Sequence, residues 1–270
     1  MAYIPTINDI RDITPLLSEK LHFDYTNYGF SFLKRRFTFL FQKLSIKKLS
    51  QFIDGIHDGS LLDDINYLFP IPTTELFRDP SFWRILRQKI NKYHSDKKLV
   101  FWLPELSSNE ELFSLLIIIQ SLNVGEDVKI YLNINNPQSK SDLLSGYLDI
   151  KNKELNKSNL KRLDDKLNED DFILNTEDEY SLKSELLKSL SVLDGNFTEA
   201  QPPKNSVFMI LFRNTMVNYN LRLQKTVESS FVECLQPDGL LALGIQERIS
   251  PNSNEYFLFN ENESIYKVIK

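Results

Sequence analysis

Residues 101–114 read Phe-Trp-Leu-Pro-Glu-Leu-Ser-Ser-Asn-Glu-Glu-Leu-Phe-Ser, and this stretch decides the fold. It continues the apolar run Leu99–Leu103, which has the length of a strand covered on both faces. Ser107 and Ser108 are each followed three residues later by a glutamate, a doubled capping box that predicts the start of a helix. A strand, a turn and a helix in this order form the part of α/β folds where nucleotide-type cofactors bind.

Apolar runs of strand length recur after this stretch. They cover residues 128–134, 207–212 and 240–245, and two more runs, 256–259 and 265–269, flank a polar Asn-Glu-Asn-Glu turn. Strands that alternate with helical segments pair in parallel, so the sequence predicts a Rossmann-like α/β domain with a mostly parallel sheet. The last two runs predict an antiparallel hairpin at the C-terminal end of that sheet.

The first third of the chain has helical spacing instead. Leu33 and Phe37 begin an apolar helix face, and short connections between such segments predict a small N-terminal helical domain over residues 1–92. The α/β domain would then cover residues 93–270. Inside it, the polar stretch 149–185 is dense in Lys, Asp, Glu and Asn, which predicts a solvated connector with one exposed helix or a mobile insert.

The composition limits the class of protein. The chain has 270 residues, 41% of them hydrophobic, and a formal net charge of −5. It can therefore bury a core, but it has no general attraction for nucleic acid or for an anionic membrane. One cysteine and three histidines far apart in sequence argue against a zinc site, and we predict no metal. The sequence has neither a signal peptide nor a membrane-length apolar run, so we expect a cytoplasmic protein without membrane insertion.

Four segments resemble, in order, motifs of the CheR family, the chemotaxis methyltransferases that methylate receptor glutamates with S-adenosylmethionine. Residues 28–36 resemble the family's basic segment, and residues 73–82 resemble its Thr-x-Phe-Phe-Arg-Asp stretch. Residues 104–111 match the cofactor loop Ala-Gly-Cys-Ser-Thr-Gly-Glu-Glu. Residues 212–247 contain matches to Cys-Arg-Asn-Val and to Leu-x-Pro-Gly-Gly-x-Leu-x-Leu-Gly-x-x-Glu. The resemblance implies a class I methyltransferase domain behind the helical domain.

The same resemblance implies roles for single residues. It assigns cofactor contacts to Thr74, Arg78, Glu110, Asn133, Arg213 and Asn214. Arg78 is also the catalytic candidate, because a guanidinium can grip the carboxylate of the cofactor's methionine part or of the substrate glutamate. A surface arginine beside Asp79 is an equally simple interpretation of Arg78, and helix capping is an equally simple one of Glu110. Ser191-Val192-Leu193 aligns with the family's Asn-Leu-Leu.

The chain departs from the family at five cofactor or catalytic positions: Pro72, Glu105, Asn109, Asn133 and Asn218. Glu105 and Asn109 replace glycines that would let the backbone approach a ligand without a Cβ and adopt positive φ. We expect Glu105 to project into the space of the cofactor's methionine tail. Asn133 replaces an acid that accepts both ribose hydroxyls, at a cost of about 1–2 kcal/mol. Asn218 displaces the family's tyrosine ring to Tyr219, for which we expect a packing role.

The resemblance leaves two functions open. The favoured hypothesis is a pseudoenzyme, a CheR-like pseudo-methyltransferase that needs no cofactor and binds a protein partner, for example a chemoreceptor or another signalling protein. The alternative is an active protein-glutamate O-methyltransferase with a weakened S-adenosylmethionine site, supported by the retained Thr74, Arg78, Glu110 and Asn214. Binding of a different small molecule in the altered cleft is a third hypothesis.

Overall fold

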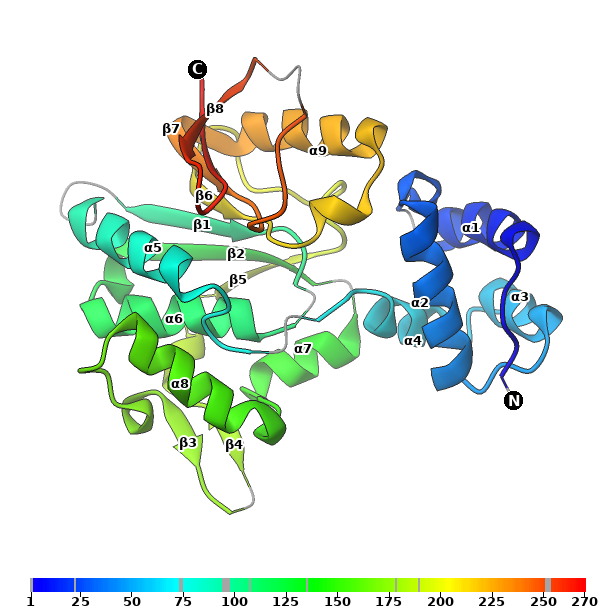
Figure 1. The fold of residues 1–270 in the computed structure, drawn as a ribbon, viewed down its shortest axis with the longest axis horizontal. Helices are drawn as coiled ribbons and strands as arrows, with labels where there is room; N and C mark the ends of the chain where they lie inside the picture. Colours follow the sequence, from blue (N-terminus) through cyan, green and yellow to red (C-terminus); the bar gives the residue numbers. More distant parts are fainter. Residues whose placement is uncertain are drawn as a thin grey trace.

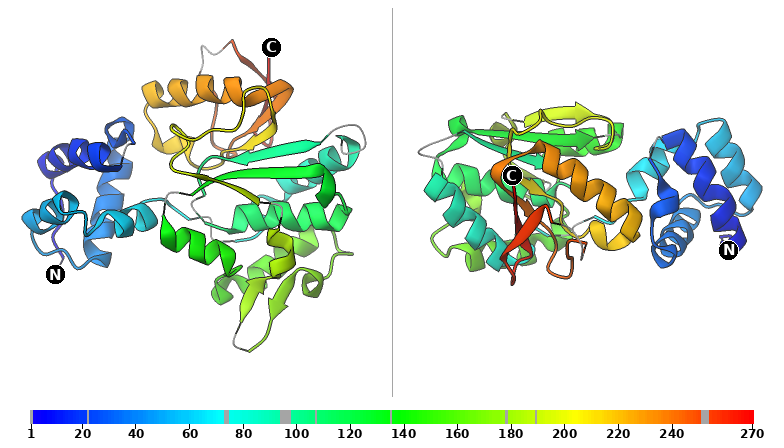
Figure 2. Two further views of the ribbon diagram at one scale, coloured as in Figure 1. Left: turned by 180° about the vertical axis from the view of Figure 1, so that it is seen from behind. Right: turned by 90° about the horizontal axis from the view of Figure 1, so that it is seen from above.

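The computed structural model describes residues 2–21, 23–72, 75–93, 98–106, 108–134, 136–177, 179–188, 190–250 and 254–270. Figure 1 shows two parts, an α/β unit built around a twisted sheet and a smaller group of N-terminal helices. The helices lie beyond one end of the sheet strands, and the views in Figure 2 agree on this arrangement.

Among the described residues, seven strands form one sheet with the order β5–β2–β1–β6–β7–β9–β8. They are β1 (Leu99–Leu103), β2 (Val128–Ile134), β5 (Leu190–Asp194), β6 (Val207–Leu211), β7 (Leu235–Ala242), β8 (Tyr256–Asn260) and β9 (Ile265–Val268). The strands from β5 to β7 in this order are parallel, whereas β9 is antiparallel to both β7 and β8. The predicted fold, a mostly parallel sheet with a C-terminal antiparallel hairpin, is confirmed.

The central strand β1 is buried on both faces because successive side chains point to opposite sides of the sheet. Phe101 and Leu103 pack into the apolar cluster that also contains the helix after β1. Trp102 points to the other face, where its ring lies 5.3 Å from the ring of Phe231. Burial on both faces explains why this strand is a continuous apolar run.

Helices cover both faces of the sheet (Figure 1). α5 (Pro80–Tyr93), α6 (Glu110–Leu122) and α8 (Lys153–Leu163) lie on one side, and α9 (Leu221–Cys234) lies on the other. The sides of α6 are almost wholly buried, which explains its apolar composition. The short helix α7 (Pro137–Leu144) follows β2 and contacts the N-terminal helices.

The N-terminal helices are α1 (Ile7–Leu21), α2 (Phe30–Lys43), α3 (Leu49–His57) and α4 (Leu62–Leu68). Their core is aromatic: the Phe41 and Phe52 rings lie 4.7 Å apart, and Phe37 packs edge-on against Phe52. The buried Arg36 guanidinium donates to the carbonyls of Leu68, Phe69 and Pro70. This arginine therefore fixes the exit from α4, where the chain leaves the helices for the α/β unit.

Aromatic rings also join the two parts of the molecule. The Tyr28 ring packs edge-on against the Tyr219 ring at 4.9 Å, and the same two residues form a β-bridge. The Gly29 amide donates to the Asn218 carbonyl at 2.7 Å. One apolar cluster thus extends from the N-terminal helices into the α9 side of the sheet.

The predicted division at residue 92 groups α5 with the N-terminal helices, but α5 contacts α6 and α8 in the α/β unit.

The polar stretch 149–185 has more regular secondary structure than a solvated connector would have. It contains α8 and a hairpin of β3 (Ile173–Asn175) and β4 (Tyr180–Leu182). Buried asparagines of α8 bond to both backbone groups of Leu76. A few buried side chains thus give this stretch an ordered structure, although most of its residues are polar.

Candidate functional site

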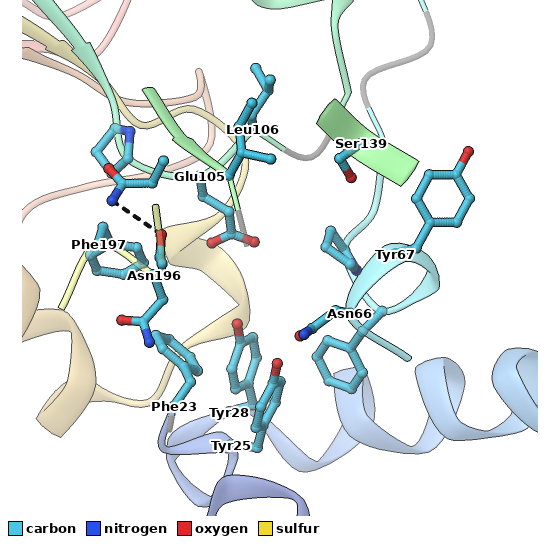
Figure 3. Close-up of a pocket in the computed structure, with 16 residues that line it drawn as sticks. Phe23, Tyr25, Tyr28, Asn66, Tyr67, Glu105, Leu106, Ser139, Asn196 and Phe197 are labelled. Carbon is cyan, nitrogen blue, oxygen red and sulfur yellow. Dashed lines mark hydrogen bonds between the residues drawn. The ribbon is translucent and has the colours of Figure 1, made fainter. Parts of the chain in front are cut away.

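A cavity lies at the carboxyl ends of β1 and β2, beside the point where the strand order reverses between β1 and β6. In open α/β sheets, ligands bind in this crevice. Figure 3 shows the side chains around it, which come from both parts of the chain. They include Tyr25, Tyr28, Phe69, Glu105, Asn133, Asn196 and Phe197. The cavity volume is about 60 Å³.

Glu105 projects into this cavity, toward Tyr28 (Figure 3). Its Oε2 atom accepts a hydrogen bond of 3.0 Å from the Tyr219 hydroxyl. Burial raises the pKa of Glu105 from 4.5 to about 7, although the Tyr219 hydrogen bond favours the charged form. Tyr219 therefore both packs, as expected, and holds the carboxyl group in place.

Neither of the two residues that the resemblance aligns with glycines adopts a conformation that would require glycine. Glu105 is not among the described residues with positive φ, and Asn109 has φ −80°. What the glycine replacement adds at Glu105 is side-chain volume and charge.

Asn133 uses its side chain within the scaffold. Its Oδ1 accepts from the Trp102 indole at 2.8 Å. Its Nδ2 donates to the carbonyls of Ala200 at 2.7 Å and Gly195 at 3.3 Å. The residue is buried at the end of β2 and lines the cavity. These bonds tie β2 to β1 and to the loop after β5.

A second cavity of about 420 Å³ adjoins the first and shares Tyr67, Pro70, Leu106 and Ser139 with it. Glu110 lines this second cavity and is only 9% exposed, and its Oε2 atom is buried without a hydrogen-bond partner among the described residues. Burial raises the pKa of Glu110. An unpartnered buried carboxyl oxygen beside a cavity is suited to a cationic or hydrogen-bond-donating ligand.

The helix α6 begins at Glu110 with Asn109 as its N-cap residue, so the capping box predicted for Ser108 and Glu111 is wrong, and the box predicted for Ser107 lies outside the described residues. The Asn109 side chain makes no capping hydrogen bond. Glu110 and Glu111 are therefore its first two residues rather than capping residues one turn later. Their negative charges still lie at the positive end of the helix dipole.

The segment around Arg78 has a strained backbone that hydrogen bonds to other parts of the chain stabilise. Phe77 and Asp79 on either side of it have φ of 53° and 59°, unusual for residues other than glycine. The Phe77 amide donates to the Ser114 hydroxyl at 2.8 Å. Asp79 accepts from Arg213 at 2.7 Å. Arg78 is half-buried and lines none of the described cavities.

Arg213 is buried in the same network. Its guanidinium pairs with Asp79 and, at 3.3 Å, with Glu111, and it stacks 4.1 Å from the centre of the Phe82 ring. Burial raises the pKa of Glu111, and the nearby Arg213 opposes that shift. The structure thus places Arg213 beside the Arg78 segment, outside the described cavities.

Asn214 lies at the end of β6 with φ 63° and faces a small cavity together with Glu105 and Asn218. Its backbone amide donates to the Glu247 carboxylate at 2.7 Å, as do the amides of Val217 and Gly244. A Cβ on Gly244 would lie 2.6 Å from the Asn214 Oδ1 atom. Glu247 and Gly244 therefore build the loop that presents Asn214.

Of the six predicted contact residues, the structure brings Asn133, Asn214 and Glu110 to the cavities and places Arg78 and Arg213 behind them. Thr74 lies outside the described residues. Residues 191–193 lie inside β5 rather than at the cavity, and Asn196 and Phe197 line it instead. The sequence had no signal for these two residues, because the strand before them, β5, has partly exposed side chains.

Two classes of site have no support in the described part of the chain. No cluster of three or more His, Cys, Asp or Glu side chains is arranged there to hold a metal ion. No helix there has both the length and the apolar character needed to cross a membrane.

Comparisons with known proteins give the family. The model of the CheR methyltransferase S-adenosylmethionine-binding domain matches residues 72–265. A Pseudomonas putida (strain KT2440) protein that carries the name methyltransferase Cher3 is 22% identical over 247 residues, which are 89% of this chain and 89% of that protein.

Two solved structures have more distant similarity. One, from Galdieria sulphuraria, is named as a sarcosine dimethylglycine methyltransferase; it is 13% identical, with a TM-score of 0.34 over 62% of this chain and 46% of its own. The chain thus spans about half the length of that protein. The other, from Listeria monocytogenes, is named as a class I S-adenosylmethionine-dependent methyltransferase; it is 12% identical, with a TM-score of 0.33 over 88% of this chain and 73% of its own. The family model covers well over half of the chain, so the chain belongs to the CheR methyltransferase family.

Proposed function

We propose that this CheR-family protein is a pseudo-methyltransferase: it does not use S-adenosylmethionine and acts as a protein-binding regulatory module in signalling. The observation that carries the proposal is the Glu105 carboxyl group, which occupies the crevice at the end of β1 and is held by Tyr219. The crevice of the fold is therefore filled by the chain itself.

The methionine end of S-adenosylmethionine does not fit the crevice as it stands. It carries a carboxylate, which a charged Glu105 would repel, and it needs the volume that the Glu105 side chain takes. The cavity volume left is about 60 Å³, and aromatic rings from the N-terminal helices form one wall of it. Moving Glu105 aside would break its partly buried hydrogen bond with Tyr219.

The ribose end meets a second obstacle. An acid at the end of β2 would accept both ribose hydroxyls, but Asn133 has only one side-chain acceptor, and Trp102 already donates to it. Its amide group is directed to the Ala200 and Gly195 carbonyls. A ribose diol would have to compete with bonds that hold the sheet and its loops together.

The retained family residues are compatible with a scaffold role. Arg213, Asp79 and Glu111 form a buried ion-pair network behind the crevice. Glu247 and Gly244 shape the loop after β6. Such contacts stabilise the fold whether or not a cofactor binds, which supports the retention of the scaffold in a protein with a different use for its surface.

A second function has one specific observation in its favour. The unpartnered Oε2 atom of Glu110 faces a cavity of about 420 Å³ next to the crevice. In an active protein-glutamate O-methyltransferase this carboxyl group would bind the ammonium group of the cofactor, and Arg78 would grip a carboxylate. Glu105 lines both the crevice and the small cavity that Asn214 faces, so its side chain lies where the two cavities meet.

Thermal unfolding separates the two functions. With S-adenosylmethionine or S-adenosylhomocysteine at about 1 mM, we expect no change in melting temperature for the natural chain or for Glu110→Gln. If the second function is correct, the natural chain melts about 3 °C higher with ligand, and Glu110→Gln does not. The partner role fails if a native pull-down from the source cells recovers no signalling protein.

A further inference from the structure

The free edge of the sheet is unusually apolar. Among the described residues, β8 pairs only with β9, so its other edge has unpaired backbone groups. Phe257, Leu258 and Phe259 on β8 are 45%, 44% and 41% exposed. Three consecutive exposed apolar residues on an edge strand are what native proteins normally avoid, because such an edge pairs with other chains.

A cavity of about 230 Å³ opens beside this edge, between α5 and the β8–β9 hairpin. Leu99, Phe208 and Leu240 contribute apolar side chains to it, and Tyr93 and Phe259 are aromatic members of its lining. Phe257 lies opposite Lys267 in the register, so these two side chains share a face of the hairpin. The cavity lies at the opposite ends of the strands from Glu105.

Lysines concentrate at the same place. Lys89 of α5 lies 4.0 Å from the centre of the Phe259 ring, and Lys267 of β9 lies 5.8 Å from that of Phe257. Burial lowers the pKa of Lys89, and the charges of Lys92 and Lys267 lower it further. Asp238 pairs with Lys267, but no carboxylate in the described chain pairs with Lys89. An anionic group bound here would relieve the repulsion among the lysines.

We propose that the β8 edge and this cavity are a docking surface for an extended segment of a partner protein that carries acidic and apolar side chains. The segment adds a strand to β8 through backbone hydrogen bonds. Its apolar side chains pack against Phe257, Leu258 and Phe259, and its carboxylates pair with Lys89 and Lys267. The surface goes beyond the proposed function, because it uses no residue of the cofactor crevice.

Charge favours an acidic segment over a second copy of this chain. Pairing of β8 with β8 in a dimer would bring the lysines of one copy near those of the other, with only Asp238 to offset them in each lining. A small anion could contact the lysines, but it would leave the β8 backbone edge and Leu258 uncovered. A strand with acidic and apolar side chains would pair with the lysines, with the β8 backbone edge and with the exposed apolar side chains together.

Fluorescence anisotropy with labelled decapeptides tests the proposal. The probe alternates glutamate and valine, one matched peptide has lysine in place of glutamate, and another has N-methyl groups that prevent backbone pairing. We expect the acidic probe to bind at least about tenfold more tightly than either matched peptide. Lys89→Glu and Phe259→Ser should each weaken it by about fivefold or more, whereas Lys20→Glu on α1 should not.

Each contrary result overturns a defined part of the proposal. Equal binding of the lysine peptide, or an unaffected Lys89→Glu, excludes recognition of an acidic segment. Equal binding of the N-methylated peptide excludes strand addition. No binding of the acidic probe, or a dimer that Phe259→Ser dissociates, excludes the surface as a partner site. Saturating S-adenosylhomocysteine should leave probe binding unchanged. Binding of the cofactor product would therefore contradict the pseudo-methyltransferase proposal without contradicting the docking surface.

Discussion

At the scale of single residues, the proposed function rests on Glu105. The side chain is partly buried, its carboxyl group accepts a hydrogen bond from Tyr219, and the rings of Tyr25 and Tyr28 lie close by. Burial raises the pKa of Tyr219 well above its ordinary value, and the Glu105 charge raises it further, so Tyr219 remains the donor. A partly buried acid–phenol pair thus lies at the crevice, with the Glu105 carboxyl group in its lining.

The partly buried Glu105 predicts a pH dependence of stability. Its pKa is raised from 4.5 to about 7 on folding, so the folded chain binds more protons than the unfolded chain in that interval. Stability should therefore fall as pH rises from 4.5 to 7, by up to about 3 kcal/mol from this group. Urea unfolding at several pH values should show that Glu105→Gln lacks this part of the fall. An identical pH profile for both proteins contradicts the burial of the carboxyl group.

Asn133 supports a second prediction at this scale. In Asn133→Asp, a carboxylate oxygen replaces the amide that donates to Ala200 and Gly195, so oxygen faces oxygen. We expect a loss of about 1–3 kcal/mol in the free energy of unfolding and no gain of cofactor binding. Asn133→Asp that keeps full stability and binds S-adenosylhomocysteine would instead identify Asn133 as a weakened ribose contact.

Residue roles could be predicted only where they depend on short-range sequence. The projection of Glu105 into the crevice followed from its place two residues after β1. The partners of Asn133 could not be predicted, because Ala200 is distant in sequence and reaches it only in the folded sheet. The same limit hid Asn196, Phe197 and the hydroxyl role of Tyr219.

At the scale of elements, the ends of β6 and β7 are joined by one carboxylate. Glu247 accepts from the amides of Gly244, Asn214 and Val217, with bonds of 2.6 to 2.8 Å. Burial raises the pKa of Glu247, and the three backbone donors oppose that shift. The loop after β6 therefore depends on a side chain from the segment after β7.

Glu247→Gln should weaken this connection between the segments that follow β6 and β7. The amide of glutamine would direct N–H groups at backbone N–H donors, so we expect a loss of about 2 kcal/mol in the free energy of unfolding and faster hydrogen exchange at Asn214 and Val217. Glu261→Gln, on the exposed β8–β9 turn, is the matched control and should change neither quantity. Equal hydrogen-exchange rates at Asn214 and Val217 in both variants would show that Glu247 does not hold the loop after β6.

Elements with strong periodicity were predictable, and those fixed by packing were not. β1 and β2 begin and end where the apolar runs do, because both strands are buried in the centre of the sheet. β5 was missed because it is an edge strand with partly exposed side chains. The three-residue strands β3 and β4 were missed because they are shorter than any periodic signal.

At the scale of the whole molecule, the N-terminal helices close the crevice from the side. Tyr28 is 8% exposed and touches aromatic rings of both parts, including Phe69 at 5.6 Å and Tyr219 at 4.9 Å. In open α/β sheets, ligands bind in this crevice. Here the aromatic joint stabilises the contact between the parts and narrows the entrance.

Tyr28→Ala should uncouple the two parts. Removal of this ring leaves a cavity in the shared cluster, so we expect a loss of about 3 kcal/mol and faster proteolysis after α4. Tyr147→Ala, whose ring is 56% exposed, is the control and should cost less than about 1 kcal/mol. A Tyr28→Ala loss no larger than that of the control contradicts a joint formed by this ring.

Isothermal titration calorimetry of the natural chain with S-adenosylmethionine and S-adenosylhomocysteine tests the closed crevice most directly. At pH 8, where Glu105 is charged, we expect no saturable binding with a Kd below about 1 mM for either compound. Saturable binding with a Kd in the micromolar range would contradict the account, because a cofactor held that tightly cannot share the crevice with the Glu105 carboxylate.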